Sequence, residues 1–486
     1  MQTIILVSRG QEMSSAPFGV RRDPMFSLSQ LEHIQEAMVR ILVRIGIRVR
    51  QENVRELVRQ KGFHIKADRA MFDREVVMSF IEAERARNGN AYGVLEFKPS
   101  SNTLTLGILS YPQNVHDINT DEIVPFNSKR LIEATKIVDA LADRGVRGAV
   151  PGCPTDVPPE LQPIKQYWIG ATYCRSGQYP VDAKSVETMR YVMEMADVLS
   201  HPIRSLPVYV FSPLSLGGES LNCVLEFKDR LHSVGVSNML SVGCSAPIRV
   251  GDAYAMAIAE VVGSAIVVRE ITGLEVHWRI RLCPFDMRGL AMILGSPEDF
   301  LLQLATSEVN AFFHGTKWWQ AADSVHTIAK LPDAQSVAEK ASLMTVGALL
   351  GARDFSSAGA LSLDEVFSAE QLVLDCEIKD HVQRMVTGLD TDCDPESCVN
   401  DVALGIERGF IGLDSTLNNY KSMYWHPRLF DRQFLAPWLG AGSQTIRKRA
   451  REMVKHLLES YDYSLDTNVQ KELDKIYARA ESDFGL

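Results

Sequence analysis

The stretch KWWQAADSVHTIAKLPDAQ, residues 317–335, concentrates side chains that can bind a charged small molecule. Aromatic faces attract organic cations, and a nearby carboxylate balances their charge. Two adjacent tryptophans, Trp318 and Trp319, are followed within a few residues by Asp323, His326 and Lys330. Side chains alternate along a strand, so only one tryptophan shares a face with Asp323. This alternation favours an inward-facing Trp319 and Asp323, and a Trp318 that packs under helices.

The segment EVHWRIRL, residues 275–282, has one apolar and one basic face. Its even-numbered residues are all apolar and predict contacts with covering helices, whereas Arg279 and Arg281 lie on the face predicted to point inward. Buried arginine needs a carboxylate partner or an anionic ligand. A structural ion-pair network and an anchor for an anionic substrate group therefore both remain open.

Further candidates flank these segments. Phe285, Asp286 and Arg288 follow the basic strand, and Tyr209 and Phe211 lie on the apolar strand LPVYVFS. The aromatic residues could line a cation site. Asp286 and Arg288 are open to two interpretations, a salt-bridged corner or ligand contacts, and His326 could equally cap a loop.

Composition and missing motifs exclude several classes of protein. The net charge of −10 disfavours nucleic-acid binding. The sequence contains no phosphate loop, Rossmann fingerprint, HExxH or nucleophile elbow. The eight cysteines include no CxxC pair, which suits a reducing cytosol and gives no zinc-site spacing. The DxHxxG sequence that supplies a cobalt-ligating His in many corrinoid modules is also absent, so no metal is predicted from the chain's own motifs.

The same sequence features favour a cytoplasmic protein without a membrane span. The N-terminal run TIILV is too short for a signal peptide core. The most apolar segment, residues 253–268, is below spanning length and carries Glu260 at its centre, so we predict a buried helix.

From Ser128 onward, short apolar strands alternate with helical segments, which predicts an α/β protein with a parallel sheet. Eight units favour a (β/α)8 TIM barrel over an open doubly wound sheet, because no Gly-rich fingerprint follows the first strand. Capping residues at Ser296, Asp333 and Ser368 support the helix starts. The predicted strands begin at Gly145, Tyr179, Leu206, Asn238, Glu275, Lys317, Ala352 and Gly409.

Four regions are predicted along the chain. Residues 1–90 form an N-terminal helical region, with a capping box at Ser29 and Glu32 and a helix over Glu52–Gln60. Residues 91–128 form a small β hairpin or meander, 129–426 the TIM-barrel domain, and 427–486 a C-terminal helical arm.

Several segments resemble the trimethylamine:corrinoid methyltransferase family. They are LSQLEHIQEAMVRILVRIGIRV near the start, CPFDMRGLAMILGSPEDF, AKLPDAQSVAEK, FSAEQLVLDCEI and the tail GFIGLDSTLNNYKSMYWHPRLFDRQFLAPWLGAGS. Their order and spacing cover nearly the whole chain. No pyrrolysine is printed, so the resemblance is to the non-pyrrolysine branch, which includes glycine betaine:corrinoid methyltransferase. Gly289, Ile328 and Asp414 depart from residues that are usual in the family.

The resemblance implies a methyltransferase that moves a methyl group from a quaternary amine to the Co(I) of a corrinoid (cobalamin) carried by a separate partner protein. A homo-oligomer is possible. Two alternatives remain: a metal-dependent TIM-barrel lyase or hydrolase with ligands near Asp286, Asp323 or His326, and a non-catalytic quaternary-amine binding protein. No catalytic residue is assigned, and the candidate substrate contacts are Trp319, Asp323, His326, Lys330, Phe285, Asp286, Arg288, Arg281, Tyr209 and Phe211.

Overall fold

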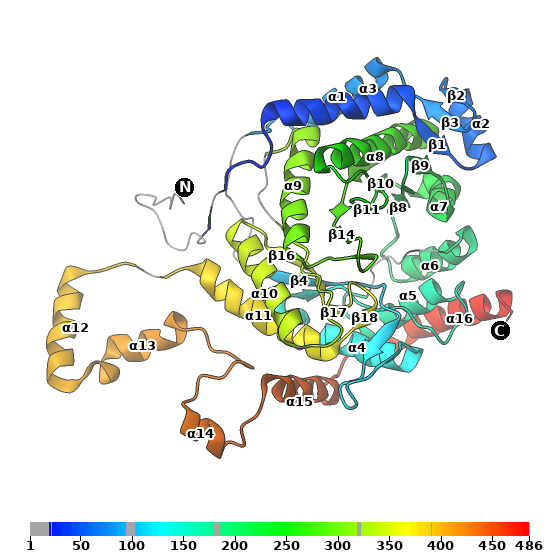
Figure 1. The fold of residues 1–486 in the computed structure, drawn as a ribbon. Coiled ribbons are helices and arrows are strands. Elements are labelled where there is room, and N and C mark those ends of the chain that lie inside the picture. Colours follow the sequence, from blue (N-terminus) through cyan, green and yellow to red (C-terminus); the bar gives the residue numbers. More distant parts are fainter. Residues whose placement is uncertain are drawn as a thin grey trace.

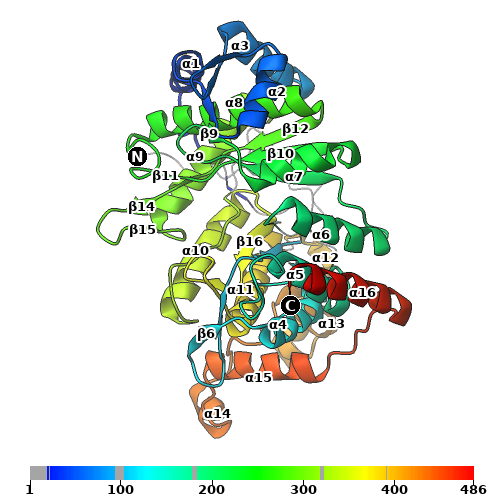
Figure 2. The same ribbon diagram turned by 90° about the vertical axis from the view of Figure 1, so that its right-hand side faces the viewer.

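The computed structural model describes residues 19–485 apart from residues 21, 94–102, 178–181, 183, 318–321 and 390. Helices surround two central groups of parallel strands, and an extended C-terminal arm stands away from them (Figure 1). Figure 2 shows the N-terminal helices stacked above helix α8 (Val250–Thr272) and the strands of one sheet. The chain is therefore a mixed α/β protein, as the alternating pattern predicted.

The N-terminal region contains three helices, α1 (Leu28–Arg44), α2 (Glu52–Gln60) and α3 (Arg74–Arg87). Helix α2 has the predicted bounds, and Gly62 follows it at a φ of 89°. The capping box lies at Ser27 and Gln30, so the prediction of Ser29 and Glu32 is wrong. Both quartets fit the S-x-x-E/Q pattern, and the helix starts at the earlier one, which brings Leu31 into the core.

Three short strands complete this region and connect it to the rest of the fold. They are β1 (Ile47–Val49), β2 (His64–Lys66) and β3 (Arg69–Met71). Strand β1 pairs antiparallel with β3 and parallel with β9 (Ser215–Leu216). The N-terminal region is thus joined by backbone hydrogen bonds to a loop between a central strand and its following helix.

Two three-stranded parallel sheets form the centre. One has the order β12 (Glu275–Arg279), β10 (Ser233–Ser237), β8 (Ser205–Tyr209). The other has the order β16 (Asp354–Ala358), β4 (Thr105–Ile108), β7 (Val146–Arg147). A single parallel bridge joins Ser324 to Ser356. The described strands do not close into one barrel, so the predicted TIM barrel is borne out only as an α/β fold with parallel strands.

The strand predictions differ in outcome. Those near Gly145, Leu206, Glu275 and Ala352 correspond to β7, β8, β12 and β16, whereas the one near Asn238 contains only β11 (Leu240–Ser241). The predictions at Tyr179 and Lys317 lie largely outside the described residues.

Two differences have physical explanations. The prediction of a strand at Gly409 is wrong, because Phe410–Gly412 forms a 3-10 helix (η3) with no strand beside it among the described residues. Strand β10, sequence SVGVS, was not predicted because Ser and Gly alternate with its two valines and leave a weak apolar signal. Its valines are nevertheless fully buried, because helix α8 (Val250–Thr272) packs against this strand.

Residues 103–126 contribute to both kinds of pairing. Strands β5 (Asn114–His116) and β6 (Ile123–Pro125) form the predicted antiparallel hairpin. Strand β4 instead lies between β16 and β7 in the parallel sheet.

Helices pack around these sheets, and their N-terminal caps confirm the predicted starts at Ser296, Asp333 and Ser368. The helices are α4 (Ser128–Ala140), α5 (Gln162–Tyr173), α6 (Val186–Val198), α7 (Glu219–Phe227), α8 (Val250–Thr272), α9 (Pro297–His314), α10 (Ala334–Leu349) and α11 (Ala369–Thr387). The short elements are η1 (Ala142–Arg144), η2 (Lys228–Arg230), β13 (Leu282–Cys283), β14 (Phe285–Asp286), β15 (Ala291–Met292), β17 (Ala360–Leu361) and β18 (Val366–Phe367).

Helix α8 is the predicted buried helix. It is long and apolar enough to cross a membrane, but 78% of its most apolar window is buried inside the protein. Glu260 at its centre is fully buried and accepts hydrogen bonds from Ser212 Oγ, Leu214 N and Asn238 Nδ2 at 2.8–2.9 Å. The Glu260 carboxylate in this apolar helix thus fixes, through hydrogen bonds, the segments that follow β8 and β10.

The C-terminal part begins with α12 (Pro395–Arg408), η3, α13 (Asp414–Met423) and α14 (Leu435–Gly440), which form the arm on the left of Figure 1. Helix α15 (Ile446–Glu459) then packs against α4 and α11, and α16 (Thr467–Asp483) packs against α5 and α6.

Candidate functional site

The carboxyl ends of the strands in the β8–β10–β12 sheet carry an aromatic and a basic residue that were candidates from the sequence, Tyr209 and Arg279. Tyr209 and Arg279 are the last residues of β8 and β12, and both are in register with Ser237 at the end of β10. Residues in register share a face of the sheet, and neighbouring strands lie about 4.8 Å apart, so the two Cα atoms are roughly 10 Å apart. A phenol and a guanidinium therefore flank one strand at the carboxyl edge of the sheet.

An acidic and aromatic corner surrounds Tyr209. Its hydroxyl donates to Asp182 Oδ1 at 2.8 Å. The hydroxyl of Tyr111, in the loop after β4, also contacts Tyr209 and Asp182. Burial and the Asp182 carboxylate raise the pKa of both tyrosines, and Asp364 acts on Tyr111 in the same direction. Two aromatic rings beside carboxylates form an arrangement that suits an organic cation.

A basic corner lies around the end of β12. Arg281 Nη2 pairs with the fully buried Asp299 Oδ1 at 3.2 Å, and Asp299 also accepts from Gly295 N and Gln303 Nε2 at 3.0 Å. Burial raises the pKa of Asp323, while the charges of Arg281 and Arg279 lower it in part. Arg281 therefore belongs to an ion pair, and 27% of its side chain remains open to solvent.

Several of these groups are open to solvent although protein surrounds them. Tyr111 and Tyr209 are 52% and 39% exposed, and Asp323 is exposed as well. Burial is nevertheless the largest cause of the raised pKa of all three. From these two observations we infer that the side chains line a recess, which water enters and which has protein on several sides. We call this group of residues at the strand ends, Tyr111, Asp182, Tyr209, Arg279, Arg281 and Asp323, the strand-end recess.

His326 lies in a polar network behind the recess. Ser324 Oγ contacts its Nδ1, and Ser357 Oγ lies 3.1 Å from Nδ1 and 3.0 Å from Nε2. Burial and the charges of Arg281 and Lys340 lower the pKa of His326 to about 3, so the imidazole is neutral at physiological pH. Its polar contacts lie within the network, which fits a wall residue.

A buried ion pair supports this network. Lys340 Nζ donates to Asp375 Oδ2 at 2.8 Å and to the Ser357 carbonyl at 2.9 Å, and both charged side chains are fully buried. Ser357 has a φ of 73°, a left-handed conformation that costs free energy in a residue other than glycine. The lysine therefore holds a strained serine against His326.

The remaining predicted contacts have partners of their own. The Arg50 guanidinium lies 4.3 Å from the ring centroid of Phe211, so a cation from the same chain occupies that ring. Asp286 accepts from Arg288 N at 2.9 Å and from its Nε at 3.2 Å in the β14–β15 hairpin, which is the salt-bridged corner. Phe285 is half-buried in the same hairpin, and Lys330 Nζ is exposed and donates to the Ile328 carbonyl at 2.9 Å. The expectation for Trp318 and Trp319 falls outside the described residues.

Sequence reasoning did not single out Tyr111, Asp182 or Asp299 as site residues. Asp299 lies in the first turn of α9 and pairs with Arg281. Tyr111 and Asp182 lie in connections, where no periodic pattern indicates the direction of a side chain. A carboxylate or tyrosine shortly after a short apolar run is the one signal that was present for them.

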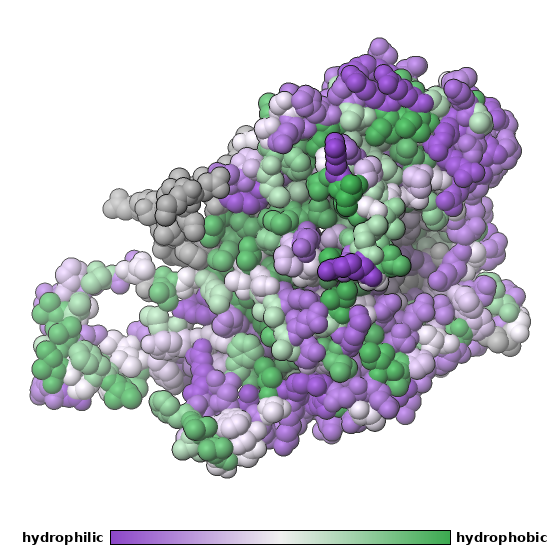
Figure 3. Space-filling model, in the orientation of Figure 1, coloured by the Kyte–Doolittle hydropathy of each residue, from purple (hydrophilic) through white to green (hydrophobic). Residues whose placement is uncertain are grey.

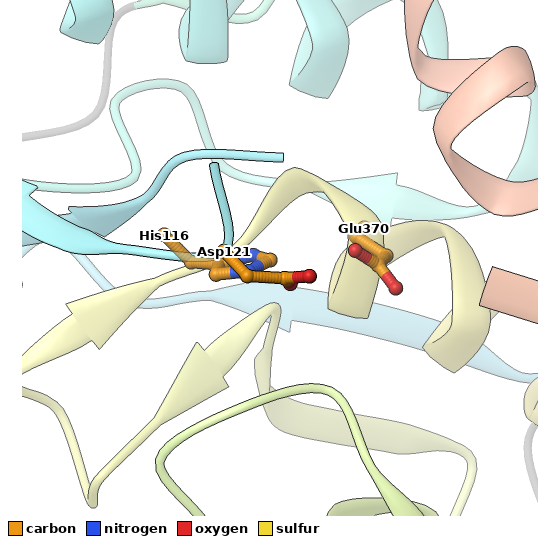
Figure 4. Close-up of side chains that lie close together, drawn as sticks. All are labelled: His116, Asp121 and Glu370. Atoms are coloured by element: carbon orange, nitrogen blue, oxygen red, sulfur yellow. The ribbon is translucent and has the colours of Figure 1, made fainter. Parts of the chain in front are cut away.

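Among the described residues, one group of three potential metal ligands lies within 4.8 Å: His116, Asp121 and Glu370 (Figure 4). His116 Nε2 contacts Asp121 at 3.0 Å. Arg447 and Arg451, both on α15, each pair with Asp121 and with Glu370. Two carboxylates already neutralised by two guanidiniums are a structural junction that leaves no charge for a divalent cation, and we call it the α15 junction.

Comparison with known proteins identifies the family. The sequence profile of the family described as Trimethylamine methyltransferase (MTTB) matches residues 8–485. The trimethylamine methyltransferase MttB of Methanosarcina barkeri (strain Fusaro) is 29% identical over 288 residues, which are 58% of this chain and 57% of the relative, so this match spans little more than half of either protein.

Two further comparisons cover more of the chain. The glycine betaine methyltransferase of Desulfitobacterium hafniense (strain Y51) is 22% identical over 94% of this chain and 97% of its own length. The crystal structure of the Methanosarcina barkeri monomethylamine methyltransferase MtmB matches 89% of this chain at 11% identity, with a TM-score of 0.38. On the strength of the profile match, the chain belongs to the trimethylamine methyltransferase family.

Proposed function

We propose that this protein transfers a methyl group from a zwitterionic quaternary amine of the glycine betaine type to the Co(I) of a corrinoid on a separate protein. One observation carries the proposal: Tyr209 and Arg279 end the two strands that flank β10, on the same face of one sheet. The acidic, aromatic corner suits the ammonium group, and the basic corner suits the carboxylate. The name of the full-length Desulfitobacterium relative supports this choice of substrate class.

Each corner supplies a different kind of binding energy. A tyrosine face contributes roughly 0.5–2 kcal/mol to binding a cation, depending on how dry the contact is. Asp182 adds the charge that balances an ammonium which cannot itself donate hydrogen bonds. Arg279 and Arg281 can each present paired N–H donors to a carboxylate. Asp299 holds Arg281 while a quarter of its side chain stays exposed toward solvent.

The chemistry asks for positioning more than for proton transfer. A quaternary ammonium leaves as a neutral tertiary amine, so the reaction requires no general acid. The residues of the recess must bind the cation, direct one methyl group toward the opening and exclude water. The corrinoid supplies the nucleophile when its carrier protein is docked. His326 fits poorly as a cobalt ligand of this chain, since both its ring nitrogens contact Ser357.

We also propose that the two described sheets belong to a (β/α)8 barrel. The Ser324–Ser356 bridge supports this proposal, because it joins the segment before α10 to the edge strand β16 of one sheet. The division into regions 1–90, 91–128, 129–426 and 427–486, and a cytoplasmic location, remain parts of this proposal.

A methyl-donor screen tests the proposal. The purified chain is mixed with cob(I)alamin and with glycine betaine, carnitine, choline or trimethylamine, and methylcobalamin is followed by absorbance. We expect turnover with the carboxylate-bearing quaternary amines and little with choline. No methylcobalamin from any donor, together with no binding in calorimetry, would falsify the assignment.

The same samples separate the alternative functions. Stoichiometric metal in the purified protein would favour the lyase or hydrolase, and tight betaine binding without turnover would favour a binding protein. The residues named for the metal alternative, Asp286, Asp323 and His326, form no group of three potential ligands within 4.8 Å in the described part of the chain. The one such group there, at the α15 junction, has both its carboxylates paired with arginines, so neither place favours the metal alternative.

A further inference from the structure

The helices of the arm, α12, η3, α13 and α14, expose an unusual amount of apolar surface. Thirteen large hydrophobic residues between positions 399 and 439 are at least 37% exposed. Figure 3 shows hydrophobic residues gathered on this part of the molecule. They are Val399, Val402, Leu404, Ile406, Phe410, Ile411, Leu417, Tyr420, Met423, Tyr424, Phe434, Leu435 and Leu439.

These residues follow the helical period. Val399, Val402 and Ile406 lie at spacings of three and four along α12. Leu417, Tyr420 and Met423 lie at spacings of three along α13, so each helix carries an apolar stripe. Such a stripe normally faces a core. In the arm helices, only Gly405 on α12 is buried, and α12 and α13 make their main contacts with η3 (Figure 1).

Helices of this length need a cover. Helix α12 has 14 residues and α13 has 10, and isolated helices shorter than about 12–15 residues are marginal in water. The connection between α13 and α14 is anchored, because Glu377 Oε1 accepts from the backbone N–H groups of residues 428–430 at 2.9–3.1 Å. The arm is thus held at its base, and the residues that the structure describes leave its apolar stripes uncovered.

The amount of surface matches a protein interface. At about 150–200 Å² for a fully exposed large side chain, the thirteen residues present roughly 1,000–1,500 Å². The largest apolar patch of a typical monomer is about 300–600 Å². A standard interface buries about 800 Å² on each partner, so the arm exceeds what one stable contact requires.

Charge favours a second copy as the occupant. Residues 395–440 carry five acidic and four basic side chains, a net charge of −1, whereas the whole chain carries −10. The arm is therefore the part of a strongly acidic protein that can approach an identical copy with little repulsion. The arm stands on the outside of the ring of helices, away from strand β8, which ends at Tyr209 (Figure 1).

We propose that two copies of this chain associate through the arm, with the apolar stripes of α12, α13 and α14 packed across a twofold axis. A self-complementary patch of this kind closes into a dimer without further contacts. Aromatic residues, here Phe410, Tyr420, Tyr424 and Phe434, are typical of the fully buried centre of such interfaces.

Light scattering of the full chain after gel filtration tests the proposal. We expect a mass of at least twice 54.2 kDa for the wild type. The double variant Ile406→Asp/Ile411→Asp and the single variant Leu417→Asp should shift toward monomer. Leu28→Asp is the matched control, because Leu28 and Leu417 are both 56% exposed and Leu28 lies on α1, where an acid in the first turn is tolerated.

Two outcomes would overturn the proposal: a wild type that remains monomeric over the micromolar range, or arm variants that keep the wild-type mass. If an aspartate variant fails to fold, hydrogen exchange of the wild type, measured at several protein concentrations, tests the dimer instead. Protection of α12 and α13 should then fall on dilution, and protection independent of concentration contradicts the dimer. All arm variants should retain methyl transfer to free cob(I)alamin, which separates this test from that of the proposed function.

Discussion

The strand-end recess and the α15 junction use charged side chains in opposite ways. At the junction, Asp121 and Glu370 are each contacted by both Arg447 and Arg451, so every charge is matched within the chain. In the recess, Tyr209, Arg279 and Asp323 are exposed to water. Matched charges stabilise a fold, whereas partly unmatched charges in a recess can bind a ligand. For this reason we assign a functional role to the strand-end recess and a structural role to the α15 junction.

The largest effect is expected where a matched charge is fully buried. Lys340→Met leaves Asp375 without its cation, and removing one partner of a buried pair costs about 3–5 kcal/mol. Urea unfolding followed by circular dichroism measures the free energy of unfolding. The double variant Lys340→Met/Asp375→Leu should lose less than the single one. A single variant within about 1 kcal/mol of wild type would mean that this pair is not a structural support.

A smaller effect, on activity and not on stability, is expected in the recess. Arg279→Gln removes a charged donor from the proposed carboxylate site, which is worth about 1.5–3 kcal/mol, or roughly a 10- to 100-fold loss in kcat/KM for a betaine. The melting temperature should stay unchanged, since the side chain is exposed. Arg288→Gln, on an exposed hairpin, is the control and should retain activity. Equal losses in both variants would contradict the assignment of the basic corner.

The aromatic corner should show a graded response. Tyr209→Phe keeps the ring and loses the hydrogen bond to Asp182, so kcat/KM should fall by no more than about tenfold. Tyr209→Leu also removes the ring. Its kcat/KM should fall further, because the lost contact between ring and cation contributes about 0.5–2 kcal/mol of binding free energy. Steady-state kinetics with a betaine donor measures both variants. If the leucine variant is as active as the phenylalanine variant, the ring does not contact the cation.

The smallest effect concerns the pH dependence of the α15 junction. Burial opposes ionisation of Asp121, but hydrogen bonds from His116, Arg447 and Arg451 outweigh it and lower its pKa to about 2. A lowered folded-state pKa gives stability that is present above the unfolded value of about 3.9 and is lost as pH falls toward 2. Because Asp121 is partly exposed, we expect about 1 kcal/mol.

Hydrogen exchange of α15 between pH 5 and pH 2 checks this sign, with the intrinsic exchange rate corrected at each pH. The corrected protection should be constant above about pH 4 and should decrease below it. Asp121→Asn should remove most of that decrease. A junction that loosens as pH rises would contradict the assignment of the charges.

Local structure was more predictable from sequence than the site was. The caps at Ser296, Asp333 and Ser368 and the bounds of α2 depend on neighbouring residues, so the sequence states them directly. The apolar face of β12 was predictable for the same reason, since Val276 and Trp278 are buried as alternation requires.

Contacts between distant segments were not predictable in the same way. Arg281 was expected to need a carboxylate, but nothing local identifies Asp299 among the 61 acidic residues. The sequence suggested that Phe211 lines a cation site, but in the structure Arg50 from the N-terminal region lies against its ring. Strand β10 shows the same limit, because SVGVS becomes a strand only when β8 and β12 lie on both sides.

The pairing of β1 with β9 has a consequence for how the protein can be modified. Strand β9 follows Tyr209 by a few residues, and Arg50 directly follows β1 and donates to Ser215 Oγ at 2.8 Å. The N-terminal region therefore fixes the geometry of the loop that follows β8, and it is not a detachable module. Exchanging it between relatives should alter donor selectivity even when every residue in contact with the donor is kept.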